Sequence, residues 1–338
     1  MVFSRLVTGD GPVPGKRFRK CSLEAFSQWV RTIGNGLFDK PTREQYNTAK
    51  QDNSRTRKAQ MEIIRTAEFA ELVSIPVERE RKKIKLVVSD IEGCLNLNEH
   101  TYDLDALSWI KAANQLARED NPIPFITVCS GRQHAFVEAI TQLISGTLPA
   151  VFENGCGLYF PTRSLYNEYA WHPLLSQPEV LSQFMKVRQN IVEEVIASNQ
   201  ARRVPGKEMM LSLHPVPPVE VKEVYSVVAE TVAKRQLVAS VTRSASAVDI
   251  TPTGIDKAAG VRWLLDSLEG VFPVKLANVA GVGDSVGDLS FLCIVGFSAA
   301  PANASEHVKS QVEYCSSWAD GQGVVDIIKH CITINMQP

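Results

Sequence analysis

From Ile84 onward, short apolar runs alternate with longer segments whose apolar residues recur at helical spacing. The short runs are nearly continuous in Val, Ile, Leu and Phe instead of alternating with polar residues. Such runs are typical of parallel strands that helices cover on both faces. The pattern therefore predicts an α/β fold with a Rossmann-like parallel sheet. The predicted strands are 84–90, 124–130, 150–154, 275–284 and 294–300, and the first predicted helices are 103–119 and 133–145.

A stretch of about 85 residues interrupts this alternation and predicts a second, smaller α+β domain. It contains helical spacing over 177–199 and 218–236, a strand-like run at 208–215 and a pair of strands within 236–252. We therefore expect a core domain formed by 84–161 and 248–338. The segment 162–247 is expected to form a cap domain that is inserted into the core.

Residues 1–83 are predicted to form a helical N-terminal extension, because apolar residues recur at helical spacing over 22–33 and 42–73 is rich in helix-forming residues. Residues 1–85 carry 18 Lys and Arg against 10 Asp and Glu, whereas the whole chain carries 36 against 37. This basic extension could meet an anionic partner, but we favour a solvated helical surface or docking of the extension on the acidic remainder, because its charges are scattered. The basic residues are not interleaved with aromatic residues, so we expect no nucleic-acid partner.

The composition, 44% hydrophobic and 22% charged, is ordinary for a globular protein. No apolar run reaches the roughly 18 residues that a membrane-spanning helix needs, so no membrane partner is expected. The N-terminus lacks the apolar core of a secretory signal, which predicts a cytoplasmic location. The seven cysteines form no Cys-x-x-Cys pair, and this spacing favours neither a zinc site nor a disulfide framework.

Polar and charged residues gather where the predicted strands end. In an open α/β sheet, the carboxyl ends of the strands form the active site. A set of carboxylates, one hydroxyl and one amine at this edge suits a phosphate ester. One carboxylate can attack phosphorus, and a second can act as general acid and base. Two more can hold Mg²⁺, while the hydroxyl and the amine bind the phosphoryl oxygens. The candidates are Asp90, Glu92, Ser130, Gly131, Asn154, Lys257, Asp284 and Asp288.

Four of these segments resemble, in the same order, the four motifs of the haloacid dehalogenase-like phosphohydrolases. They are "DIEGCL" from Asp90, "SGR" from Ser130, the isolated Lys257, and "GDSVGD" from Gly283. The resemblance covers about residues 84–334 and implies a Mg²⁺-dependent phosphatase that forms an aspartyl-phosphate.

Carried over to this chain, the resemblance implies a role for each candidate residue. Asp90 would be the nucleophile and Glu92 the general acid and base. Phosphate and substrate would be bound by Ser130, Gly131, Lys257 and Asn154. The Mg²⁺ ligands would be Asp90, Glu92 through its backbone carbonyl, Asp284 and Asp288.

The spacing of the motifs resembles one subgroup of this family. Only 40 positions separate Asp90 from Ser130, whereas 127 separate Ser130 from Lys257, which leaves room for a cap after the third strand. This arrangement is similar to that of the sucrose-phosphate, mannosyl-3-phosphoglycerate and Cof-type phosphatases, which carry a late-inserted α+β cap. The resemblance implies a small phosphorylated metabolite, a sugar phosphate, as the substrate.

Two residues depart from the family pattern. Glu92 stands where the family usually has Asp, and Gly287 stands where it usually has Asn. A longer acid shifts the carboxylate, and small displacements of catalytic groups slow reactions. Two alternatives therefore stay open at this point: a phosphomutase of the same family, and a binding or regulatory protein with a weakened site.

One basic segment of the cap is a further candidate for substrate binding. Residues 201–210 include Arg202, Arg203 and Lys207, which could meet an anionic or polyhydroxyl leaving group. A solvated loop explains the same composition, and we favour that interpretation.

Overall fold

The computed structural model of the chain describes residues 84–97, 101–161, 168–244 and 246–337. The predicted helical extension 1–83 lies outside the described residues, together with its proposed docking or partner role. Among the described helices, none combines the length and the apolar character that crossing a membrane requires.

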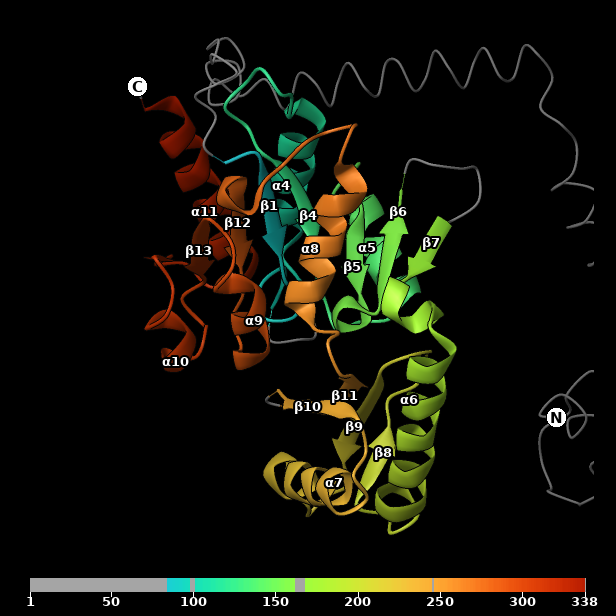
Figure 1. Cartoon of the computed structure of the whole chain (residues 1–338). Coiled ribbons are helices and arrows are strands. Elements are labelled where there is room, and N and C mark those ends of the chain that lie inside the picture. Colours follow the sequence, from blue (N-terminus) through green and yellow to red (C-terminus); the bar gives the residue numbers. More distant parts are fainter. Residues whose placement is uncertain (1–83, 98–100, 162–167, 245, 338) are drawn as a thin grey trace, which may run out of the picture. The chain divides into compact units, whose positions relative to one another are not determined.

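The core of the structure is a parallel sheet of five strands (Figure 1), and the predicted α/β fold is confirmed. Its central strand β1 (Leu86–Ser89) pairs with β12 (Val279–Val282) on one side and with β4 (Phe125–Val128) on the other. Strands β13 (Phe297–Ala300) and β14 (Tyr314–Cys315) complete it in the order β14-β13-β12-β1-β4. Strands β1, β4 and β12 end in register, so the segments that follow them begin at one edge of the sheet.

Helices cover both faces of this sheet, as continuous apolar strands require. Val87 packs into one buried cluster with Ile110 and Ile328, whereas Leu86 and Val88 pack into another on the opposite face. Asp103 caps the helix that begins at Leu104, because its side chain accepts hydrogen bonds from two backbone N–H groups of the first turn. The helices of the core are α4 (Leu104–Leu116), α5 (His134–Leu143), α8 (Lys257–Leu268), α9 (Leu289–Leu292), α10 (Glu306–Lys309) and α11 (Asp320–Met336).

Two smaller groups of strands extend the core. An antiparallel sheet is formed by β5 (Ala150–Phe152), β6 (Gly157–Phe160) and β7 (Glu168–Trp171), and a parallel bridge between Cys129 and Val151 joins it to the end of β4. A short hairpin, β2 (Asn96–Leu97) with β3 (Thr101–Tyr102), follows the segment after β1. The 3₁₀ segments of the core are η3 (Glu153–Gly155), η4 (Pro173–Ser176), η6 (Leu276–Asn278) and η7 (Val286–Asp288).

The inserted cap is an antiparallel sheet packed against two helices, α6 (Pro178–Ile191) and α7 (Val221–Lys234). Phe184 of α6 and Val224 of α7 share one buried cluster with Leu213 and Ile250 of the sheet. A π-helical turn η5 (Val192–Ile196) continues α6. The strands are β8 (Ala201–Arg203), β9 (Leu211–Pro215), β10 (Ala239–Arg243) and β11 (Val248–Pro252), in the order β10-β11-β9-β8.

The strand pairing differs from the predicted cap bounds of 162 and 247, because one core strand continues past the first bound and one cap strand continues past the second. Strand β7 pairs with β6, so the sheet of the core continues to Trp171. Strand β11 pairs with β9 and β10, so the sheet of the cap continues to Pro252. The reason is that apolar strand patterns predict strands but not their partners, which only long-range packing decides.

Gly155 allows helix α8 to pack closely against the loop after β5, and we predict that replacing it destabilises the fold. Its φ is +97°, and an added Cβ would lie 2.1 Å from the carbonyl oxygen of Asp256, which caps α8. We expect Gly155→Ala to lower the free energy of unfolding by about 2–4 kcal/mol, from backbone strain and the clash together.

Gly270 provides the matched control for this prediction. Its φ of +84° imposes a similar backbone strain, but an added Cβ would meet nothing within 4 Å. Gly270→Ala should therefore cost only about 1 kcal/mol, the strain alone. Urea unfolding measures both variants, and equal losses would show that the close packing of Gly155 against α8 contributes nothing.

Candidate active site

Four of the predicted site residues meet at the carboxyl edge of the core sheet. Asp90 follows β1, Asp284 follows the end of β12, Asp288 closes η7, and Lys257 is the first residue of α8. Asp90, Lys257 and Asp288 are buried, with at most 6% of each residue exposed. The Lys257 ammonium donates a hydrogen bond to Asp288 Oδ1 at 2.5 Å, and its Nζ lies 3.0 Å from Asp90 Oδ2. The β1 and β12 ends and the start of α8 thus bring these charges together.

The three aspartates form an acidic cluster that suits a divalent cation. One carboxylate oxygen from each of Asp90, Asp284 and Asp288 lies within 4.8 Å of the others. Burial raises the pKa of Asp90 well above its ordinary value, Lys257 opposes this, and the neighbouring carboxylates add to it. Lys257 offsets one of the three negative charges, and its own pKa is raised because Asp288 and Asp90 outweigh the effect of its burial. A set of oxygen ligands with excess negative charge fits Mg²⁺.

The turn around Asp284 depends on two local features. Gly93 has a φ of +68°, and an added Cβ would lie 2.3 Å from Asp284 Oδ2, so only glycine lets the two segments approach. Asp288 Oδ2 accepts hydrogen bonds from the backbone N–H groups of Asp284 and Ser285 and from Ser285 Oγ. Asp288 therefore holds both this turn and Lys257.

The side chain of Glu92 is not part of the acidic cluster. Its carboxylate pairs with the Arg132 guanidinium and accepts a hydrogen bond of 3.4 Å from Ser130 Oγ. The Arg132 guanidinium also lies 4.8 Å from the centre of the Phe136 ring. We did not single out Arg132 from the sequence, and its position directly after Ser130-Gly131 is the one signal that could have indicated it.

The loop after β5 connects the predicted residues Gly131 and Asn154 to the cap. An added Cβ at Gly131 would lie 2.9 Å from Asn154 Oδ1, so this glycine allows the two loops to touch. Asn154 Nδ2 donates a hydrogen bond of 3.4 Å to Asp249 Oδ2 of β11 in the cap. Asn154 thus approaches the Ser130 loop with one end of its amide and contacts the cap with the other.

Glu153 is a buried residue of this loop that the sequence did not indicate. Its carboxylate accepts hydrogen bonds from three consecutive backbone N–H groups of the cap, those of Glu208, Met209 and Met210, at 2.8, 2.9 and 2.9 Å. Only 1% of the residue is exposed. Burial raises the pKa of Glu153, and the three hydrogen bonds oppose that rise. One core carboxylate therefore fixes a loop of the cap.

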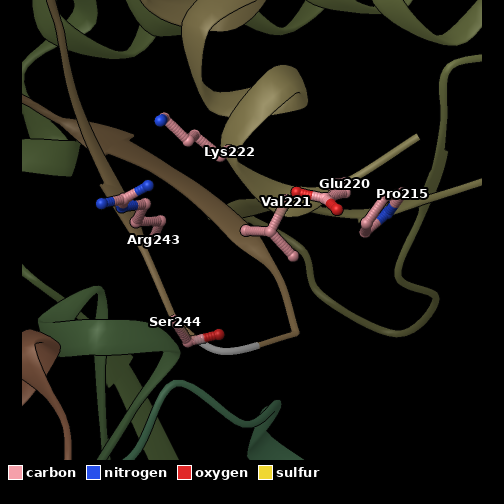
Figure 2. Close-up of a pocket in the computed structure, with 6 residues that line it drawn as sticks. All are labelled: Pro215, Glu220, Val221, Lys222, Arg243 and Ser244. Carbon is pink, nitrogen blue, oxygen red and sulfur yellow. The ribbon is translucent and has the colours of Figure 1, made fainter.

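A separate hollow in the cap contains none of the predicted site residues. Figure 2 shows it between the N-terminal end of α7 and the ends of β9 and β10. Its lining residues are Pro215, Glu220, Val221, Lys222, Arg243 and Ser244. The charged cluster at the β1 edge, with its catalytic side-chain types, is the better candidate for chemistry.

Comparison with known protein families finds one match. The family model described as haloacid dehalogenase-like hydrolase matches residues 216–328, which contain Lys257, Asp284 and Asp288. This third of the chain is therefore similar to the haloacid dehalogenase-like hydrolases. The predicted class of phosphatase is confirmed by the curated relatives, which carry the name phosphoglycolate phosphatase.

One relative and two solved structures show how far the similarity extends. A phosphoglycolate phosphatase of Methanothermobacter thermautotrophicus is 24% identical over 248 residues, 73% of this chain and 98% of the relative. The solved structure of a Thermoplasma acidophilum protein has a TM-score of 0.57 at 18% identity and covers 74% of this chain and 99% of its own. The sucrose-phosphatase of Synechocystis, solved with sucrose and phosphate, has a TM-score of 0.56 at 14% identity and covers 74% and 98%. The two structural likenesses show a shared fold.

Proposed function

We propose that the protein is a Mg²⁺-dependent phosphatase that hydrolyses a small phosphorylated metabolite through an aspartyl-phosphate on Asp90. The observation that carries this proposal is the buried contact of Asp90 with Lys257 beside the carboxylates of Asp284 and Asp288. A buried carboxylate next to a fixed ammonium, at the edge of a parallel sheet, is suited to accept a phosphoryl group.

The proposed reaction has two steps. In the first, Asp90 Oδ forms a bond to phosphorus while the bond to the ester oxygen breaks, and Glu92 gives its proton to the leaving alcohol. In the second, Glu92 takes a proton from water, the water oxygen attacks phosphorus, and Asp90 is regenerated with release of phosphate. Lys257, Ser130 Oγ and the backbone N–H of Gly131 bind the phosphoryl oxygens.

The residues of this chain also provide a place for the metal ion. Asp90, Asp284 and the backbone carbonyl of Glu92 would hold Mg²⁺, with Asp288 completing the acidic cluster. When bound, the ion reduces the repulsion between the Asp90 carboxylate and the phosphate.

The names of relatives and the sequence support a small phosphomonoester as the substrate. The sequence predicts a sugar phosphate, and the names of relatives include phosphoglycolate phosphatase and sucrose-phosphatase. Both kinds of substrate are small phosphomonoesters with a polar leaving group. A cytoplasmic location and a docking or partner role for residues 1–83 remain predictions.

Phosphate release from p-nitrophenyl phosphate, with Mg²⁺ or with EDTA, tests the proposal. We expect release that depends on Mg²⁺, whereas no release under either condition would overturn the proposal and favour a binding protein. A phosphomutase is distinguished by incubation with sugar phosphates, because it would form an isomeric sugar phosphate without releasing phosphate.

A further inference from the structure

The loop after β5 holds two consecutive non-glycine residues in the left-handed region of backbone conformation. Glu153 has a φ of +48° and Asn154 a φ of +52°. Asparagine tolerates this region, whereas glutamate adopts it rarely. Strain of this kind persists only where surrounding contacts enforce it, and it is concentrated at functional sites. The conformation of Glu153 therefore indicates that other contacts hold it in place.

Those contacts are the three hydrogen bonds that the Glu153 carboxylate accepts from the cap. Oε1 accepts from the backbone N–H of Glu208, and Oε2 accepts from those of Met209 and Met210. Within the described part of the chain, these three N–H groups donate to no other acceptor. Successive backbone N–H groups form a concave site for an anion, and here the anion is a side chain of the core. Glu153 therefore fixes the backbone of the cap at one defined point.

The segment 208–210 is joined firmly to the rest of the cap. The Arg188 guanidinium of α6 donates to the carbonyl oxygens of Glu208 and Met209. These bonds lie on the opposite side of the same peptide units that donate to Glu153. A displacement of the segment therefore displaces α6 with it.

The basic segment that leads into 208–210 is fixed as well. Arg202 and Arg203 are exposed, as the favoured interpretation of a solvated loop requires, but the side chain of Lys207 is only 8% exposed. Arg203 donates a hydrogen bond of 2.8 Å to the carbonyl oxygen of Lys207. Strand β8 therefore also holds the cap loop that Glu153 contacts.

The contact of Glu153 lies at the two chain connections between core and cap. Met210 packs in one buried cluster with Cys156, Leu175 and Ile255. Leu175 lies in η4, between β7 and α6, and Ile255 lies between β11 and α8, so this cluster joins both connections. Elsewhere the cap reaches the acidic cluster, because β10 lies beside η7, which ends at Asp288. A rotation of the cap about its connections therefore displaces β10 relative to the acidic cluster.

We infer that Glu153 is a positioning residue that sets the orientation of the cap relative to the acidic cluster. This inference rests on the proposed function, because the oriented cap is the part of the protein that meets a bound substrate. Asn154, the next residue, donates to Asp249 of β11 and strengthens the same junction. Glu153 itself is only 1% exposed and is too buried to touch the substrate. It therefore acts on substrate binding and not on transfer of the phosphoryl group.

Loss of the Glu153 carboxylate should divide the protein between the cap orientation described here and other orientations. When only a fraction of the protein is competent to bind, the apparent dissociation constant rises by the inverse of that fraction. Saturating substrate restores the competent orientation, so the rate at saturation is kept. The expected signature is a higher KM with an unchanged kcat.

Glu153→Gln in the full-length protein tests this inference. Glutamine keeps the shape of the side chain but replaces one acceptor oxygen by an NH₂ group that faces N–H donors. With p-nitrophenyl phosphate and saturating Mg²⁺, we expect KM to rise by roughly 10-fold or more, the effect of losing hydrogen bonds to a charged group, while kcat changes by less than about 3-fold.

Backbone amide hydrogen exchange of the same variant gives a readout that does not depend on catalysis. The N–H groups of 208–210 should exchange roughly 10-fold faster or more, because their acceptor is weakened. The N–H groups of β1 should exchange as in the unaltered protein, since the core is unchanged. Localised exchange distinguishes a positioning role from general support of the fold.

Glu230→Gln is the matched control, since it makes the same chemical change at an exposed position on α7 of the cap. It should leave KM and the exchange of 208–210 unchanged. An unchanged KM in Glu153→Gln, a lower kcat at unchanged KM, or exchange that accelerates equally in β1 would overturn the inference while the proposed function stands. If the unaltered protein released no phosphate, the proposed function would fall, and the role of Glu153 in substrate binding would fall with it.

Discussion

Replacement of Asp90 by asparagine is expected to lower kcat for p-nitrophenyl phosphate by roughly 10⁴-fold or more, the scale seen when a nucleophile is lost. Asparagine has the same shape, but its amide oxygen is a poor nucleophile and carries no charge. The Asp90 backbone N–H donates to Val282 and would keep doing so, and therefore the fold should persist. Steady-state phosphate release with saturating Mg²⁺ measures the loss.

Asp266→Asn is the control for this variant. Asp266 is exposed on α8, the helix that begins with Lys257, so the same chemical change is made outside the charged cluster. It should retain ordinary activity. An Asp90→Asn variant that is folded and keeps more than a tenth of the activity would assign the nucleophile to another group.

Replacement of Lys257 by methionine has the largest expected effect on stability. Lys257 is the buried cation that contacts both Asp90 and Asp288. Its loss leaves two buried carboxylates without their partner, and such a change typically costs about 3–5 kcal/mol of the free energy of unfolding. Mg²⁺ should return part of this loss, because a cation bound by the acidic cluster replaces the missing positive charge. Activity should fall as well, since Lys257 binds the phosphoryl group in the proposed reaction.

Chemical unfolding with Mg²⁺ and with EDTA measures both parts of this prediction. Lys275→Met serves as the control, because Lys275 is exposed and a surface substitution of this kind usually changes stability by no more than about 0.5 kcal/mol. If Lys257→Met lost no more than the control, the ion pairs with Asp90 and Asp288 would contribute nothing to the fold.

The fold and the charged cluster could be predicted because their signals are local. β1 is buried at all four positions, and its continuous apolar run therefore indicated a parallel strand at the centre of a sheet. The proximity of Asp90 and Asp284 could be predicted from the sequence, since parallel strands end at the same edge. Lys257 needed the additional signal of the motif order, because nothing in its own helix distinguishes it from a surface lysine.

The contacts between core and cap could not be predicted, because they depend on where separate segments pack. Glu153 meets a loop that is 55 residues away in the chain, and no spacing rule connects the two. Lys207 lies in a segment for which we favoured a solvated loop, yet packing buries it. β11 is apolar enough for either sheet, and only its pairing with β9 and β10 assigns it to the cap.

The most direct test of the account is to find the phosphoryl group on the protein. Acid quenching during turnover, followed by borohydride reduction, converts an aspartyl-phosphate to homoserine, which peptide mass spectrometry can locate. The account predicts homoserine at position 90 in samples quenched with substrate and Mg²⁺, and none without substrate. Turnover of the substrate with homoserine at another position, or with position 90 unmodified throughout, would contradict it.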